Sequence, residues 1–95
     1  MNMSMEPSMD KDLLINNMTE NLPVLRARLN MTQEDLANKI GLSRGTIISI
    51  ENSKRPMTWS TFMSLILLFS HNEKTSKLLE VMDIFTEDLH KYLSE

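Results

Sequence analysis

The sequence predicts an all-α fold, a compact helical bundle built around a helix-turn-helix. Three observations support this prediction. Apolar residues recur three or four positions apart in successive segments of the chain. Polar capping residues stand where these segments begin, and a glycine stands where one of them ends. The chain has 95 residues and 41% hydrophobic content, which suits a single small globular domain.

Residues 1–8 are expected to form a disordered tail, because they contain few large apolar groups other than methionine and include Pro7. We hypothesise that Met9 is the natural start of the chain. The N-terminal segment has no apolar core and carries Glu6 and Asp10, so it does not read as a signal peptide.

Two helices are predicted before the central motif. The first is short and runs from Asp10 to Met18, and Thr19 or Asn21 caps the second. Pro23 then falls in the first turn of the second helix, where proline is tolerated. The inward residues of the two helices are Leu13, Leu14 and Met18, followed by Leu22, Leu25 and Leu29.

The segment from Thr32 to Glu51, TQEDLANKIGLSRGTIISIE, has the signals of two short helices joined by a tight turn. Thr32 is a polar cap with an acid three residues later, Asp35, in a close variant of the capping box. Gly41 stands where a helix ends in a left-handed residue. The apolar residues between them are Leu36, Ala37 and Ile40, and the small Ala37 allows the second helix to cross closely over the first.

The second helix of this segment follows a turn that contains Leu42 and the capping residue Ser43. Ile47 and Ile50 give the helix an inward face. Its outward face carries mostly short or hydrogen-bonding groups and one long cation near the N-terminus, as a helix that reads the major groove of DNA requires. These outward residues are Arg44, Gly45, Thr46, Ile48, Ser49 and Asn52.

Thr58 is predicted to cap a helix that continues to about Ser70. This helix is apolar nearly all round, so more than one of its faces must be covered, by the N-terminal helix, the C-terminal segment or a second subunit. Trp59 is expected to anchor this packing rather than to stack on DNA. The apolar residues are Phe62, Met63 and Leu65 to Phe69.

The last segment, Glu73 to Leu93, is predicted to be a C-terminal helix with apolar residues at intervals of 4, 3, 4 and 3. They are Leu78, Met82, Phe85, Leu89 and Tyr92, the candidate dimer interface. Further apolar residues widen this stripe, so the segment packs on its own core, pairs two subunits, or does both. We expect residues 9–72 to form the DNA-binding domain, with its motif at residues 32–51, and residues 73–95 to be a dimerisation element of the same domain.

The charge is unevenly distributed. The formal net charge is -3, yet residues 22–62 carry six basic and three acidic residues and are therefore net positive. A local basic face is sufficient to bind the phosphates of DNA, while the acidic ends of the chain repel the duplex from the remaining surface. There is no cysteine, which fits a reducing cytoplasm, and the longest apolar run, Leu65 to Phe69, is too short to cross a membrane.

Together these features resemble the Xre family of helix-turn-helix regulators, the Cro and phage-repressor type, from about Leu22 to Phe69. The matching residues are Arg26 in LPVLRARL, Gln33, the pair Leu36 and Ala37, the turn IGLS and the segment TIISIENSKRP. The resemblance implies a transcriptional regulator that binds double-stranded DNA with the recognition helix, residues 44–52, in the major groove. We expect a dimer on a palindromic operator, because one such domain offers few base contacts, whereas two copies on a two-fold axis read two half-sites.

The resemblance also implies roles for individual residues. Base contacts would come from Arg44, Gly45, Thr46, Ile48 and Ser49, and phosphate contacts from Gln33, Ser43, Asn52, Lys54 and Arg55. Gln33 would in addition brace the recognition helix. Arg26 and Glu51 would form a structural ion pair that does not touch DNA.

Two outward residues depart from the family pattern. Gly45 stands where a polar, base-reading side chain is more common, so it serves either close approach of the backbone or is simply tolerated near the helix start. Ile48 is apolar on a face expected to be wet, where it either touches a thymine methyl group or lies against Arg44.

The remaining function classes have weaker support. No nucleophile, base and orienting group form a convincing arrangement, and His71 with Glu73 is a weak metal signal, so we expect no enzyme, no metal and no cofactor. The expected partners are double-stranded DNA and a second copy, in the cytoplasm and away from membranes. The alternative is an antitoxin-like or signal-responsive module that binds a protein or peptide through residues 62–93.

Overall fold

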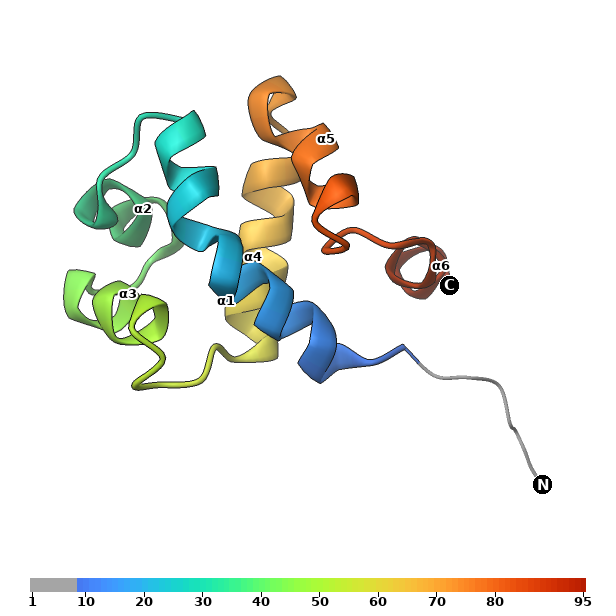
Figure 1. Ribbon diagram of the computed structural model, residues 1–95, viewed down its shortest axis with the longest axis horizontal. Helices are drawn as coiled ribbons and strands as arrows, with labels where there is room; N and C mark the ends of the chain where they lie inside the picture. The colour runs from blue at the N-terminus through green and yellow to red at the C-terminus, as the bar shows by residue number, and fades with distance from the viewer. Residues whose placement is uncertain (1–8) are drawn as a thin grey trace.

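The computed structural model describes residues 9–95, so the tail expected at residues 1–8 lies outside the described residues. Within this range the chain forms six helices and no strand, which confirms the all-α prediction (Figure 1). The helices are α1 (Lys11–Arg28), α2 (Gln33–Ile40), α3 (Arg44–Glu51), α4 (Trp59–Ser70), α5 (Glu73–Val81) and α6 (Glu87–Ser94).

Helix α1 lies at the centre of the molecule and touches α3, α4 and α5 (Figure 1). Helices α2 and α3 pack together on one side, while α6 lies on the other side of α1 and α4. The core between them is formed by side chains from all six helices. Its largest fully buried members include Met18, Leu22, Leu36, Ile47, Phe62, Phe69, Leu79 and Leu89.

The prediction of two helices before the motif was wrong, because α1 is continuous and contains Pro23 in its interior. Its buried stripe of Leu14, Met18, Leu22 and Leu25 continues across the proline at helical spacing. Pro23 lies on the exposed face, where it removes one hydrogen bond without disturbing the core. Burial of the stripe therefore outweighs the local cost of the proline. Leu13, predicted to face inward, is 54% exposed.

The prediction of one helix from residue 73 to residue 93 was also wrong. Helix α5 ends at Val81, and Asp83 adopts a left-handed conformation with φ of 56°. The amide N–H groups of Ile84 and Phe85 donate to the carbonyl of Leu79 and close the helix end. Thr86 then caps α6, since its hydroxyl accepts a hydrogen bond from the amide of Leu89. The chain turns here because Ile84 and Leu89 become fully buried in the core.

Aromatic residues attach α6 to the rest of the bundle. The Trp59 ring stacks on Phe62 with centroids 4.8 Å apart and meets Tyr92 edge-on at 6.0 Å. The ammonium of Lys11 lies 4.8 Å from the centroid of the Trp59 ring and 5.4 Å from that of Tyr92. These contacts join the starts of α1 and α4 to the end of α6. Trp59 is thus a packing residue, as the sequence indicated.

Candidate functional site

The α2–α3 unit is a pair of short helices whose ends are fixed by local hydrogen bonds. The Thr32 hydroxyl accepts a hydrogen bond from the backbone amide of Asp35. The Asp35 carboxylate accepts one from the backbone amide of Thr32, which completes a capping box. Gly41 ends α2 with φ of 79°. Ser43 caps α3 by accepting the amide of Thr46 at 3.1 Å. The turn geometry is therefore set by residues within the segment itself.

The hydrogen bonds of the capping box change the acidity of Asp35. The backbone N–H of Thr32 is the main cause of a lowered pKa for this carboxyl, and the Thr32 hydroxyl adds to the effect. The ionised form of Asp35 is thus the form that the folded helix start favours. It also places negative charge at the N-terminus of α2, where the helix dipole stabilises it.

Arg26 and Glu51 brace the far end of α3. The guanidinium binds the carboxylate through two hydrogen bonds, Nε to Oε2 at 2.7 Å and Nη2 to Oε1 at 3.0 Å. The side chains are largely buried, with exposed fractions of 16% for Arg26 and 6% for Glu51. Arg26 Nη1 also donates to the carbonyl of Met31 at 3.0 Å, in the turn before α2. One guanidinium thus ties α1 to both α2 and α3.

Gln33 joins the same cluster. Its Nε2 atom donates to Oε1 of Glu51 at 2.9 Å, so the start of α2 is tied to the end of α3. A side-chain amide has two N–H hydrogens, and this bond uses one of them. The other hydrogen can be donated to a phosphate without breaking the brace.

The outward face of α3 carries the five predicted base contacts. Arg44 and Gly45 are exposed, and Thr46, Ile48 and Ser49 are half-buried. The opposite face is closed, because Ile47 and Ile50 are buried in the core. The helix therefore presents one row of side chains outward from a fixed position.

The predicted phosphate contacts lie at the edges of this face. Ser43 is exposed before α3, and Asn52, Lys54 and Arg55 are exposed after it. Arg55 bends back over the helix, since its Nη1 atom donates to the Thr46 hydroxyl at 3.2 Å. The backbone N–H groups of Lys54 and Arg55 both donate to the carbonyl of Ser49, which holds this loop against the end of α3. Cationic groups consequently flank the outward row.

Sequence reasoning missed several contacts of this site. The bonds from Arg26 to the Met31 carbonyl and from Arg55 to Thr46 were not predicted. Burial of Met57, in the loop after α3, was also missed. The signal that could have indicated this burial is a single apolar residue in a polar loop, which is a weak signal. The two hydrogen bonds span five and nine residues, and they depend on how the chain turns after α1 and after α3, which the apolar spacing does not encode.

Gly45 has open space around it. A Cβ atom placed there would lie 4.0 Å from the Ser43 hydroxyl, which is ordinary van der Waals contact. The packing of the described chain therefore gives no reason for glycine at this position.

The five residues of the candidate dimer interface do not form one continuous stripe, because the chain turns between α5 and α6. Leu89 is fully buried within the protomer and faces its own core. Leu78, Met82 and Phe85 are partly buried against the core, and Tyr92 is 44% exposed. This part of the chain completes the protomer's own core and keeps a smaller apolar area on the surface.

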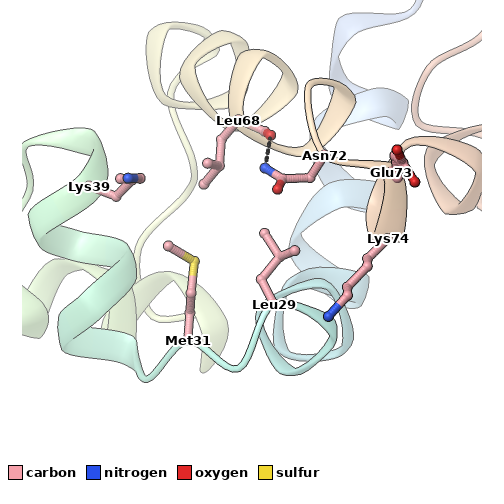
Figure 2. Close-up of a pocket in the computed structure, with 7 residues that line it drawn as sticks. All are labelled: Leu29, Met31, Lys39, Leu68, Asn72, Glu73 and Lys74. Carbon is pink, nitrogen blue, oxygen red and sulfur yellow. Dashed lines mark hydrogen bonds between the residues drawn. The ribbon is translucent and has the colours of Figure 1, made fainter.

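A hollow of about 560 Å³ opens between the ends of α1 and α4, helix α2 and the start of α5 (Figure 2). Leu29, Met31 and Leu68 line it together with Lys39 and Lys74. Asn72 also lines it and donates to the carbonyl of Leu68 at 3.0 Å. The hollow contains none of the predicted DNA-contacting residues. Across residues 9–95 there is no group of three or more potential metal ligands.

None of the helices in the described range is long and apolar enough to cross a membrane.

The centre of the chain is similar to known proteins. Residues 25–58 match the family model described as Helix-turn-helix. A segment of 37 residues is 57% identical to an uncharacterized HTH-type transcriptional regulator of Methanocaldococcus jannaschii. The match covers 39% of this chain and 56% of that protein, so the chain spans little more than half the length of this curated relative. No solved structure matches the chain.

Proposed function

We propose that this chain, which carries a helix-turn-helix of the Xre and Cro type, is a transcriptional regulator that binds double-stranded DNA at specific sequences. In this proposal α3 enters the major groove, and Arg44, Gly45, Thr46, Ile48 and Ser49 face the base edges. A major groove admits one helix, and the residues of its first turns reach the bases. The start of α3 carries Arg44, the longest of these side chains.

The single observation that carries the proposal is the combination of an outward polar row with a locked inner face. The row on α3 is accessible, while the cluster of Arg26, Glu51 and Gln33 fixes the helix against α1 and α2. Readout of bases is favoured when the reading helix is held in position before binding, because every group immobilised on binding lowers the affinity. The brace fixes the backbone of α3 in this way.

Phosphate contacts would set the register of α3 on the duplex. Gln33 and Ser43 lie at the starts of α2 and α3, while Asn52, Lys54 and Arg55 lie beyond the other end of α3. Ser43 is thus at the start of α3, while Gln33 lies beside its end through the bond to Glu51, so contacts near both ends can hold the helix on the DNA backbone. The net positive charge of residues 22–62 supports this arrangement.

Specificity in this proposal depends most on Arg44. A guanidinium matches the two acceptors of guanine in the major groove, a pairing worth about 1–3 kcal/mol of discrimination. Ile48 lies on the same row and would contact a thymine methyl group.

The regulator is proposed to act as a homodimer on a palindromic operator. One α3 of eight residues offers few base contacts, whereas two copies on a two-fold axis read half-sites about 34 Å apart. In this division residues 9–72 bind DNA and residues 73–95 contribute to dimerisation. Bound to its operator, the protein would control access of polymerase to the promoter.

The test is a selection of duplex DNA from a random library, followed by fluorescence anisotropy at two salt concentrations. The wild-type chain should enrich one sequence and bind it more weakly as salt rises. Arg44→Ala should lose preference at one base pair per half-site, by about 1–3 kcal/mol, while remaining folded.

Arg28→Ala is the matched control, because it removes the same charge from an exposed residue of α1 outside the proposed interface. It should keep the base preference of the wild type. Absence of any enriched sequence, or equal effects of the two substitutions on base preference, would contradict the proposed function.

A further inference from the structure

An apolar groove of about 730 Å³ lies between α4 and the α6 region, on a part of the surface that the proposed DNA contacts do not use. Five apolar side chains line it, together with three serines of α4. They are Met63, Ile66, Leu67, Phe85 and Leu93. The sequence predicted that more than one face of α4 would be covered, and this face is open in the protomer.

The groove combines a hollow with exposed apolar side chains. Leu67 is 70% exposed and Leu93 is 45% exposed, although both are large aliphatic residues. Clustered exposed apolar residues on a small soluble domain mark a surface that binds another molecule. Exposed aliphatic side chains beside a hollow on the same face suit a two-fold interface, because each copy can then supply a side chain to the hollow of the other.

The charge of this face indicates which molecule binds. Asp, Glu, Lys and Arg make up 24% of the chain, yet no charged side chain lines the groove. A two-fold axis brings residues of identical copies close to their own counterparts, so a charged residue near the axis meets a like charge. An uncharged face avoids this repulsion.

The position of the groove is compatible with DNA binding by both copies. Helices α3 and α6 lie on opposite sides of α1 and α4 (Figure 1). A second copy seated between α4 and α6 would therefore leave the outward row of each α3 accessible.

We propose that a second copy of this chain binds in the groove between α4 and α6, with Leu67 of each protomer packed on the groove of its partner. The inference rests on the proposed function, because it names the surface through which the proposed dimer forms. It replaces the single heptad stripe expected from the sequence with a face composed of α4, Phe85 and the end of α6. A standard interface buries about 800 Å² on each partner, so the contact would extend beyond the groove along both helices.

The test is sedimentation equilibrium of the full chain as wild type, Leu67→Glu and Val81→Glu. Val81 is 79% exposed on α5 and does not line the groove, so it is a matched control for placing a carboxylate on an exposed aliphatic position. We expect dimers for wild type and Val81→Glu. Leu67→Glu should raise the dimer dissociation constant at least about 100-fold, because the interface would bury an unpaired carboxylate.

Circular dichroism should show the same helix content for the two variants, since both positions are exposed in the protomer, while Leu67→Glu should melt at a lower temperature because it lacks the stabilisation that dimerisation supplies. A wild type that remains monomeric at its highest soluble concentration overturns the inference, as does an undiminished dimer in Leu67→Glu. Dissociation of Val81→Glu to the same degree also overturns it, because the contact would then involve α5.

Binding to DNA that carries one or two half-sites separates this inference from the proposed function. Leu67→Glu should bind a single half-site as wild type does and lose the gain from the second half-site. If none of the proteins binds selected DNA while Leu67→Glu alone fails to dimerise, the proposed function fails and the groove remains the dimer surface.

Discussion

The α2–α3 unit and the α5–α6 segment are both pairs of short helices joined by a turn, but different interactions hold them in place. In α2–α3, side chains cap both helix starts, and three polar side chains tie the pair to α1. In α5–α6, Asn72 makes no side-chain capping bond at the start of α5, and the attachment depends mainly on apolar burial, with Leu79, Ile84 and Leu89 fully buried.

The difference shows how orientation and attachment are separated in this chain. Hydrogen bonds depend on direction, so a network such as Arg26, Glu51 and Gln33 fixes the rotation of α3 and hence which side chains face outward. Apolar burial has little directional preference, so it is well suited to complete a core. Helix α3, which is proposed to read DNA, is the helix held by directional hydrogen bonds.

The largest effect is expected when the brace of α3 is removed. Glu51→Ala leaves the largely buried guanidinium of Arg26 without its partner, which should lower the free energy of unfolding by about 3–5 kcal/mol. Chemical denaturation followed by circular dichroism measures this loss. Glu80→Ala, which removes an exposed carboxylate from α5, should change stability by less than about 0.5 kcal/mol. Similar losses in the two variants would mean that the brace does not stabilise the domain.

The second effect concerns the apolar attachment of α6. Leu89→Ala removes a fully buried side chain and should cost about 2–3 kcal/mol, at the lower end of the usual range because a terminal helix can relax. Leu13→Ala, at a leucine that is 54% exposed, is the control and should cost much less. Denaturation of both variants at one protein concentration gives the comparison. Equal losses would indicate that α6 does not pack on the core as described.

The contrast between these two regions also explains which helices could be predicted from the sequence. The starts at Thr32, Ser43 and Thr58 and the end at Gly41 were predicted correctly, because each depends on a bond that spans a few residues. These signals cover the α2–α3 unit almost completely. A local rule therefore suffices where the interactions are local.

Outside the unit, burial over long distances decided the outcome. Pro23 was treated as a marker of a helix start, whereas the continuous apolar stripe of α1 holds the helix together across it. The break after α5 depends on Asp83 and Thr86, whose signals were present but were masked by the regular apolar spacing. The carbonyl of Asp83 accepts a hydrogen bond from Asn17 at 3.1 Å, a contact between residues 66 positions apart. Spacing along the sequence does not reveal such a contact.

The candidate site shows the same limit. The resemblance to a known family, rather than spacing, implied that Arg26 and Glu51 would pair. The contacts of Arg26 with Met31 and of Arg55 with Thr46 follow from how the chain turns after α1 and after α3. Base and phosphate contacts with DNA remain predictions that binding measurements must test.

The third effect compares the caps of the two regions. Thr32→Ala should cost about 1 kcal/mol, because its hydroxyl accepts a hydrogen bond from the amide of Asp35 and also stabilises the ionised Asp35 carboxylate. Thr86→Ala removes a single cap from α6, where the residue three positions on is Leu89, and should cost less, about 0.5 kcal/mol. Thermal and chemical unfolding of both variants would rank them. The reverse order would contradict the role assigned to the capping box.

The capping box also predicts a pH dependence. The folded state lowers the pKa of Asp35 below its ordinary value of 3.8, since Thr32 donates to the ionised carboxylate. Its contribution to stability is therefore present above pH 3.8 and is lost as the pH falls through the lower, folded value. The stability difference between wild type and Asp35→Asn should shrink over this acidic range. A difference that stays constant as the pH falls would count against the hydrogen-bonded carboxylate.

The smallest effect distinguishes the two roles considered for Gly45. Because its surroundings are open and its backbone is helical, Gly45→Ala should stabilise the free protein, by about 0.5–1 kcal/mol. Gly41→Ala is the contrasting variant, since φ of 79° is strained for alanine, and it should lower stability by more than that gain. Unfolding experiments on the two variants test the signs.

DNA binding by Gly45→Ala then separates close approach from tolerance. If the α3 backbone approaches the duplex closely at this point, the added methyl group should weaken binding even though the free protein is more stable. If glycine is only tolerated, binding should remain at the wild-type level. A glycine that has no packing partner in the protein and whose methyl group impairs only the complex would be selected for contact with DNA, and this result would place residue 45 directly at the interface.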